Sequence, residues 1–416
     1  MKITFLMTAL PKHPSGGPFM LYRFMDKLAE RGYEVWAVTP FSRVKWEPDF
    51  SEKISSTTFV TIRRRSFRSY VKSILLAALG ERVGRKIIGL LRTRMYQKYM
   101  WQTVVPGLIH NWSDSDVTIA TAWPTAYAAY ILMDKTIPMY YIQMYEELFA
   151  ENEETLKLTR LTYFMPLVMV ASCAWLREQI RRRINKDTYI LHPGIPVIDC
   201  TPLGREMDLR HKFLSAGRIK IVSYAKDGFA AFSDLLETMR IVFSKIGKEK
   251  IEWNVFGFNP KTTLPDNIPL NYVKGHGKEL IPLFLDSHIF LSAPWYGGFN
   301  GGALEAMSGA MAVIGAKGDF EDVIVDGVNG ILAPARDVNA IANAVIKLVN
   351  DRNLAMILAE GGLKTASEFT WDKATDNLEK IIKEAMVNYP FKGKFVDIPA
   401  LIRGDKDAID RSLNVK

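Results

Sequence analysis

The chain has 416 residues, of which 48% are hydrophobic, and a formal net charge of +9. This length exceeds one ordinary hydrophobic core and predicts two domains. Its apolar runs are shorter than the roughly 18 residues of a membrane-spanning helix, and its two cysteines, Cys173 and Cys200, exclude a disulfide framework or a cysteine metal site. We therefore expect a protein of the reducing cytoplasm.

The positive charge is concentrated in residues 61–100, which contain eleven Lys and Arg residues and one acidic residue, Glu81. Their net charge of +10 leaves −1 for the rest of the chain. Apolar residues of this segment recur at helical spacing, namely Leu75, Leu79, Val83, Ile87 and Leu90. Two interpretations stay open: a core-facing helix with a solvated basic face, or a helix that lies on anionic lipid headgroups. We expect no nucleic acid, because no known binding motif accompanies the charge.

The first half of the chain alternates apolar strands with helices. Residues 2–10 predict a buried strand, Gly16-Gly17 lie in the turn after it, and residues 19–31 predict a helix that Gly32 caps. Further strands are predicted at residues 35–39, 117–122, 139–143 and 167–171, and further helices after Trp123 and after residues 172–174. This strand–helix–strand order indicates a parallel sheet.

Five residues of the first half lie just beyond the C-terminal ends of predicted strands. Gly16 and Gly17 follow the first strand, Trp123 follows a later one, and Gln143 and Glu146 end the next. Open α/β sheets bind their ligands at this edge. These five residues are therefore candidates for ligand contact.

The second half repeats the alternation after a connector at residues 192–196. Strands are predicted at residues 219–224, 252–257, 272–275, 287–291, 312–315 and 327–332, and helices at residues 230–246, 278–285, 303–309, 338–350, 353–365 and 371–387. We predict an N-terminal domain of residues 1–195, a C-terminal domain of residues 196–370 and a tail of residues 389–416. The helix at about residues 371–388 is expected to pack back onto the N-terminal domain. A cleft between the domains would face the C-terminal strand ends of both.

A glycine-rich loop, Gly297-Gly298-Phe299-Asn300-Gly301-Gly302, joins one of these strands to a helix that starts near Ala303. A helix start leaves backbone N–H groups unpaired at the positive end of the dipole, and glycines let an anion approach them. Glu305, one turn into the helix, can direct a carboxylate at a bound hydroxyl. The loop predicts a site for phosphate next to sugar hydroxyls; the alternative is a turn whose glycines serve packing only.

This loop and helix resemble the signature of the retaining glycosyltransferases of family 4, which have the GT-B fold. Similar segments elsewhere are Gly16-Gly17, Arg31–Val35, Pro193–Ile195, Asp326–Gly330 and Phe369–Asp372, so the resemblance covers roughly residues 1–388. Tyr141–Glu146 is similar to a segment of rhamnosyltransferase-type members. Three features depart from the pattern: Gly297 replaces the first of two acids, Lys226 stands alone where the family has a basic pair, and the family's first-domain histidine has no clear counterpart around residues 123–125.

The resemblance implies an α/β GT-B protein with two Rossmann-like parallel domains that face each other across a cleft. Its implied activity is a retaining hexosyl- or deoxyhexosyltransferase, which moves a sugar from a nucleotide-diphosphate sugar to a glycan or lipid-linked acceptor. No metal or other cofactor is expected, because a helix start and the Lys226 cation could stabilise the charge that grows on the diphosphate. A degenerate GT-B protein that binds nucleotide or glycan without turnover is the alternative, which Gly297 motivates.

The resemblance also assigns roles to residues. The catalytic candidates are Lys226 and Glu305. The donor-binding candidates are Gly16, Gly17, Lys226, Phe299, Asn300, Gly301, Gly302, Ala303 and Glu305, and those on the acceptor or sugar side are Trp123, Gln143 and Glu146. For residues 61–100 we expect contact with the anionic inner face of the cell membrane.

Overall fold

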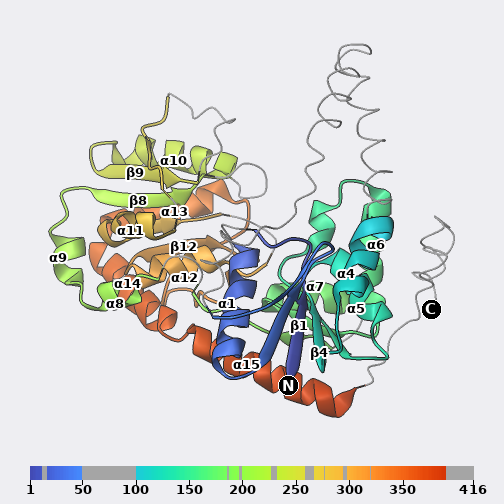
Figure 1. Ribbon diagram of the computed structural model, residues 1–416. Helices are drawn as coiled ribbons and strands as arrows, with labels where there is room; N and C mark the ends of the chain where they lie inside the picture. Colours follow the sequence, from blue (N-terminus) through green and yellow to red (C-terminus); the bar gives the residue numbers. More distant parts are fainter. Residues whose placement is uncertain are drawn as a thin grey trace.

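The computed structural model describes residues 1–11, 16–48, 100–184, 187–195, 199–225, 232–257, 267–275, 277–293, 298–318 and 320–389. Within these ranges the chain forms two parallel α/β domains, each built on its own sheet (Figure 1). Several sequence predictions lie outside the described residues: Lys226, Gly297, the basic segment up to residue 99 and the tail beyond Tyr389. None of the described helices is both long enough and apolar enough to cross a membrane.

The described part of the first sheet has the order β3-β2-β1-β4-β5-β6-β7. Its strands are β1 (Lys2–Leu6), β2 (Glu34–Val38), β3 (Arg43–Lys45), β4 (Val117–Ala120), β5 (Ile137–Ile142), β6 (Val168–Ala171) and β7 (Tyr189–Ile190). All neighbours pair in parallel except β2 and β3. Every residue of β4 and β6 is buried, as expected for parallel strands that helices cover on both faces.

Helices cover both faces of the first sheet. They are α1 (Gly17–Glu30), α4 (Val105–Asn111), α5 (Trp123–Ile131), α6 (Glu153–Phe164) and α7 (Ala174–Ile184), with the short turns η1 (Met100–Val104) and η2 (Glu146–Phe149). Side chains alternate along β5: Met139 and Tyr141 pack toward α1, whereas Tyr140 and Ile142 pack toward α4, α5 and α6. This period of two divides the domain into two cores.

The second sheet has the order β10-β9-β8-β11-β12-β13 in the described ranges, and all its pairs are parallel. Its strands are β8 (Ile219–Tyr224), β9 (Ile251–Phe256), β10 (Asn271–Tyr272), β11 (Ile289–Leu291), β12 (Ala312–Ala316) and β13 (Ile331–Ala333). Its helices are α8 (Thr201–Arg205), α9 (Leu209–Leu214), α10 (Phe232–Ile246), α11 (Ile281–Asp286), α12 (Gly301–Ser308), α13 (Val338–Asn350) and α14 (Arg352–Ala366).

One predicted helix is interrupted. Residues 278–285 predict a single helix, but the structure has a 3-10 turn, η4 (Gly277–Leu280), followed by α11. Pro282 lies in the first turn of α11. Because proline has no backbone N–H, it is accommodated at a helix start and cannot continue the preceding turn.

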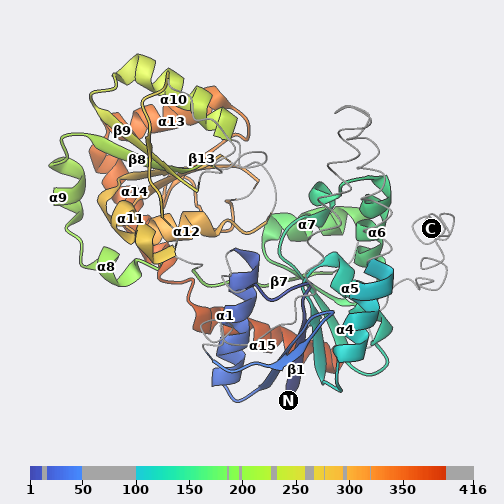
Figure 2. The ribbon, with the colours of Figure 1, turned by 45° about the horizontal axis from the view of Figure 1, so that its top comes forward.

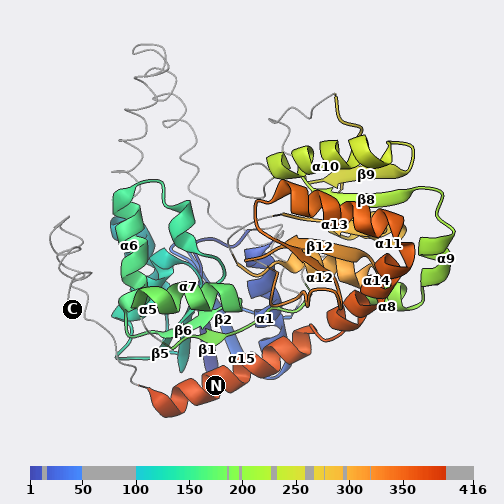
Figure 3. The ribbon, with the colours of Figure 1, turned by 180° about the vertical axis from the view of Figure 1, so that it is seen from behind.

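The last described helix, α15 (Trp371–Asn388), runs from the second domain along the first (Figure 3). Leu378 and Ile381 lie in the core that β1 and α1 build. The indole N–H of Trp371 donates to the carbonyl oxygen of Ile195 at 2.9 Å. The two places where the chain passes between the domains are thus tied together. The predicted domain boundary at residue 195 lies here and stays a prediction.

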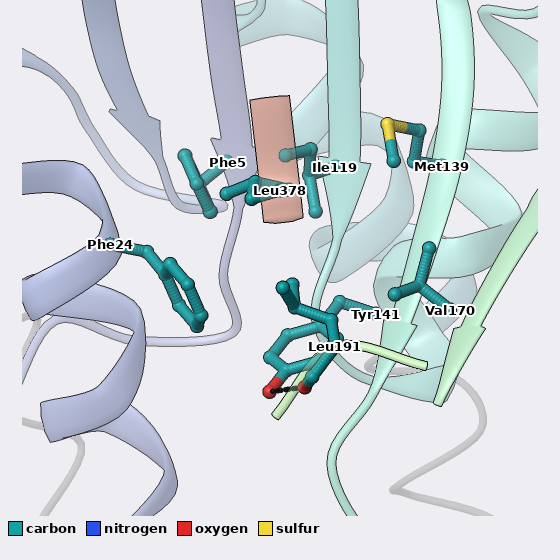
Figure 4. Close-up of a pocket in the computed structure, with 8 residues that line it drawn as sticks. All are labelled: Phe5, Phe24, Ile119, Met139, Tyr141, Val170, Leu191 and Leu378. Carbon is teal, nitrogen blue, oxygen red and sulfur yellow. Dashed lines mark hydrogen bonds between the residues drawn. The ribbon is translucent and has the colours of Figure 1, made fainter. Parts of the chain in front are cut away.

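A small apolar cavity lies between the first sheet, α1 and α15 (Figure 4). It is lined by Phe5, Phe24, Ile119, Met139, Tyr141, Val170, Leu191 and Leu378. The hydroxyl of Tyr141 donates to the Leu191 carbonyl oxygen at 3.2 Å. This lining offers no group for chemistry, so the cavity is a packing gap and the candidate site must be sought elsewhere.

Candidate active site

The start of α1 and the end of β5 meet at the C-terminal edge of the first sheet. Gly16 precedes α1 with φ +56° and makes no side-chain cap bond. A Cβ atom on Gly17 would come closer than 3.0 Å to Oε1 of Gln143. That oxygen is buried, and among the described residues it has no hydrogen-bond partner. Unpaired backbone N–H groups and an amide side chain are thus brought together where a ligand is expected.

Glu146 and Trp123 are also brought together at this edge. One carboxylate oxygen of Glu146 accepts from the Trp123 backbone N–H at 3.2 Å, and the other accepts from the Tyr140 hydroxyl. Trp123 begins α5, whose N-cap residue Ala122 has no polar side chain, so Glu146 meets the positive end of that helix. Burial raises the pKa of Glu146 to about 7, although both hydrogen bonds oppose the shift. A group that titrates near neutrality suits proton transfer.

The second domain contributes the start of α12. Asn300 caps this helix, with its Oδ1 accepting from the Ala303 N–H at 3.4 Å. Gly301 is buried, whereas Gly302 is partly exposed. A Cβ atom on Gly302 would lie 3.4 Å from Asn300 Oδ1 and 3.5 Å from Phe290 Cζ, which is ordinary contact. Among the described residues, packing therefore does not require glycine at position 302.

Glu305 lies one turn further along α12 and is partly buried. Tyr224, the last residue of β8, is near enough that the Glu305 charge adds to burial, the larger cause, in raising the pKa of its phenol. β8 leads through Ala225 to Lys226, which lies outside the described residues. The Glu305 carboxylate is therefore at the C-terminal edge of the second sheet, as the sequence predicts, while the position of Lys226 stays a prediction.

The two edges touch each other through the glycine-rich loop. Gly298 and Met144 form an isolated antiparallel bridge between the domains. A Cβ atom on Gly298 would come closer than 3.0 Å to the Gln143 carbonyl oxygen. At Gly298, unlike Gly302, close backbone approach requires glycine. The packing interpretation of the loop is thus confirmed at Gly298, and the ligand site at Gly301 and Gly302 stays a prediction.

Sequence reasoning missed a second contact between the domains. Asp322 follows β12, and its Oδ2 accepts from the Ala174 N–H at the start of α7 and lies 2.6 Å from Nε2 of His192. The His192 ring packs on Phe299 with 5.5 Å between centroids. The available signals were weak: a histidine in the predicted connector and an acid in a predicted turn at residues 320–324.

The described residues include one Asp-x-Asp triplet, a pattern that can hold a metal; a second, Asp405-Lys406-Asp407, lies in the tail outside the described residues. Asp114-Ser115-Asp116 precedes β4 at the N-terminal edge of the first sheet. Oδ2 of Asp116 accepts from the Lys2 backbone N–H at 2.7 Å. The triplet thus lies at the edge opposite the glycine-rich loop and is no part of the candidate site.

Known proteins match this chain in two ways. Residues 211–351 match the family model described as glycosyl transferases group 1. An uncharacterized glycosyltransferase of Methanocaldococcus jannaschii is 27% identical over 153 residues, 36% of this chain and 43% of that relative. The chain spans about half the length of the curated relatives it matches.

Two solved structures align with nearly the whole chain. Sucrose-phosphate synthase from Thermosynechococcus elongatus has a TM-score of 0.62 at 14% identity, covering 93% of this chain and 99% of that one. The Anabaena protein HepE, solved in complex with UDP-glucose, has a TM-score of 0.62 at 12% identity, covering 92% and 100%. The chain thus has the GT-B fold, with two parallel α/β domains, and residues 211–351 carry a match to the glycosyl transferases group 1.

Proposed function

We propose that this protein is a glycosyltransferase that moves a sugar from a nucleotide-diphosphate sugar to a glycan or lipid-linked acceptor. The observation that carries the proposal is the start of α12, where Gly302 is partly exposed although packing allows a side chain there. The family match over residues 211–351 includes this helix. HepE, which shares the fold, binds UDP-glucose.

In the proposed complex the diphosphate lies over Gly301 and Gly302, at the positive end of the α12 dipole. Glu305 accepts hydrogen bonds from the ribose of the nucleotide. The diphosphate leaves with growing negative charge, and the helix start together with the Lys226 cation stabilises that charge. We propose that no metal ion takes part; transfer should therefore persist in EDTA, and complete, reversible loss would contradict this.

The acceptor side of the proposed site is the edge of the first domain. Trp123, Gln143 and Glu146 lie there. The Met144–Gly298 bridge joins this edge to the glycine-rich loop, which is the donor loop of the proposed site. Glu146 has a pKa of about 7, raised by burial, so it can accept a proton from an acceptor hydroxyl near neutral pH. We propose transfer of a hexosyl or deoxyhexosyl group with retention, and name no nucleophile.

The test compares two glycine substitutions. Gly302→Ala should abolish the thermal shift that a nucleoside diphosphate gives, because the methyl group occupies the phosphate position. Gly217→Ala is the matched control, since in the described part of the chain no atom beyond its two neighbours lies within 4 Å of its Cβ position. Both variants should melt like the unmodified protein without ligand. Unchanged nucleotide binding in Gly302→Ala would refute the placement.

A screen of nucleoside diphosphate sugars then separates the two activities. The proposed enzyme releases nucleoside diphosphate and elongates an acceptor, and Glu305→Gln should weaken donor binding without lowering the melting temperature. Tight nucleotide binding with neither donor hydrolysis nor transfer to any acceptor would instead indicate a binding protein without turnover, the possibility that Gly297 raises.

A further inference from the structure

Asp322 is a buried acid whose described hydrogen bonds both lead to the other domain. Its side chain is only 8% exposed. Oδ2 accepts from the Ala174 N–H at 2.6 Å and lies 2.6 Å from Nε2 of His192. A buried carboxylate is costly unless donors surround it. These donors belong to the first domain, so the carboxylate is satisfied only while the domains stay in this arrangement.

The contact continues from Asp322 to the donor loop. The His192 ring packs on Phe299 and on Phe369, with centroid distances of 5.5 and 5.8 Å, and the two phenylalanine rings are 6.0 Å apart. Phe299 stands between Gly298, which bridges to Met144, and Asn300, which caps α12. Figure 2 shows the start of α7 on the side of the first domain that faces α12.

Transfer between two domains depends on how accurately they are held. The proposed donor rests on α12 and the proposed acceptor against Gln143 and Glu146, on opposite sides of the contact. A misplacement of about 1 Å can cost about 10²-fold in rate. Asp322 bonds to Ala174 and His192, and the His192 ring contacts Phe299 of the loop, so Asp322 acts on substrates through the loop.

We infer that Asp322 is a positioning residue for sugar transfer, whose carboxylate locks the donor loop to the first domain through His192 and the start of α7. This inference rests on the proposed function for its kinetic consequence, but the domain contact itself can be tested without any activity.

The test uses Asp322→Ala and Glu321→Gln. Glu321 is the matched control, because its carboxylate accepts from Gly318 N within its own domain. Spin labels at E153C and E237C report the distance between the domains, since both positions are exposed on α6 and α10 and the native cysteines are buried. Asp322→Ala should broaden and lengthen this distance, and Glu321→Gln should leave it unchanged.

The kinetic arm follows the same variants. Asp322→Ala should lower kcat about 10²-fold, while nucleoside diphosphate affinity, which the second domain provides, changes less than about twofold. Asp322→Asn should restore most of the rate, because its oxygen still accepts from Ala174 and its NH2 group can donate to His192. Should Asp322→Ala fail to fold, His192→Phe replaces it, because this variant keeps the ring stack and removes the hydrogen bond. It should likewise lower kcat and lengthen the distance between the domains.

An unchanged distance distribution in Asp322→Ala or His192→Phe would overturn the lock, whatever the protein catalyses. A changed distance with an unchanged kcat would leave a domain contact but overturn the positioning role. If the unmodified protein transfers no sugar from any donor, the proposed function fails, and the distance measurement still decides on the lock.

Discussion

At the residue scale, buried titratable groups set how this protein responds to pH. Glu146 is a carboxyl group at the candidate acceptor edge, with a pKa of about 7 because burial outweighs its two hydrogen bonds. His288, at the entry to β11, is the opposite case: burial lowers its pKa to about 4. Each makes the free energy of unfolding depend on pH in its own window.

Glu146→Gln should raise the free energy of unfolding above that of the unmodified protein, and by more at pH 8 than at pH 5. The folded state binds more protons at Glu146 than the unfolded state between about pH 4.5 and 7, so this contribution is lost as pH rises. Glutamine stays neutral and keeps both contacts, so the gain should approach about 2–3 kcal/mol at pH 8. Urea unfolding at both pH values measures it. Glu153→Gln, on the exposed start of α6, is the control, and equal shifts at both pH values would refute the assignment.

His288→Gln should weaken the dependence of the unfolding free energy on pH in the acid range. Nδ1 of His288 accepts from Lys220 N at 3.1 Å, and its Nε2 N–H donates to the Lys212 carbonyl oxygen at 2.9 Å, so only the neutral ring satisfies both contacts. The unfolded state therefore binds more protons between about pH 4 and 6.5, and stability rises with pH across this window by up to about 3 kcal/mol. The slope of the unfolding free energy against pH, obtained from urea unfolding, measures this contribution.

His211→Gln, on the exposed surface of α9, should keep the slope of the unmodified protein. A slope that survives in His288→Gln would assign the acid sensitivity to other groups.

At the element scale, α12 and the loop before it perform two separate tasks. The bridge between Gly298 and Met144 joins the loop to β5, while Gly302 opens the helix start. The two tasks depend on different glycines four residues apart. Substitutions at these positions should therefore have opposite effects on binding and on domain arrangement.

Gly298→Ala should open the domains without removing nucleotide binding. Its methyl group would collide with the backbone carbonyl of Gln143, which cannot move aside as a side chain can. Small-angle X-ray scattering should show a larger radius of gyration for Gly298→Ala than for Gly302→Ala, and calorimetry should show the reverse order of nucleotide affinity. Equal radii in the two variants would contradict the role of the bridge.

At the scale of the whole molecule, the uneven charge distribution predicts how the protein meets a membrane. Residues 61–100 carry +10 while the rest of the chain carries −1. We propose that this segment rests on anionic lipid and brings a lipid-linked acceptor to the cleft. Each surface Lys or Arg contributes about 1 kcal/mol near such a membrane, and salt screens the attraction.

Liposome sedimentation tests this attachment. Binding should require anionic lipid, fall with salt, and weaken when Arg82, Arg85 and Lys86 become Gln. In the control, Lys245, Lys248 and Lys250 become Gln, which changes the total charge by the same amount. These exposed residues lie at the end of α10 and in the turn after it. Equal binding to neutral and anionic vesicles would refute the membrane role and leave the basic segment for an anionic glycan acceptor.

Much of the fold follows from local pattern. The alternation of apolar strands with helices predicted both parallel sheets, and the glycine-rich loop predicted the start of α12 to within two residues. Glycines and strand ends also pointed to Gly17, Gln143 and Glu146, because parallel strands gather their C-terminal ends at one edge. The break before α11 was missed, although Pro282 was its local signal.

The amino-acid sequence by itself thus determined the class of fold and the edge where ligands are expected, since strand and helix periods are local properties of the chain. Only the tertiary structure decided which residues meet between the domains. Asp322 and Ala174 are 148 residues apart in sequence, and no local period encodes such a pair. The same holds for Gly298 and Gly302, whose separate roles follow from what surrounds each Cβ position, because steric limits come from neighbours distant in the chain.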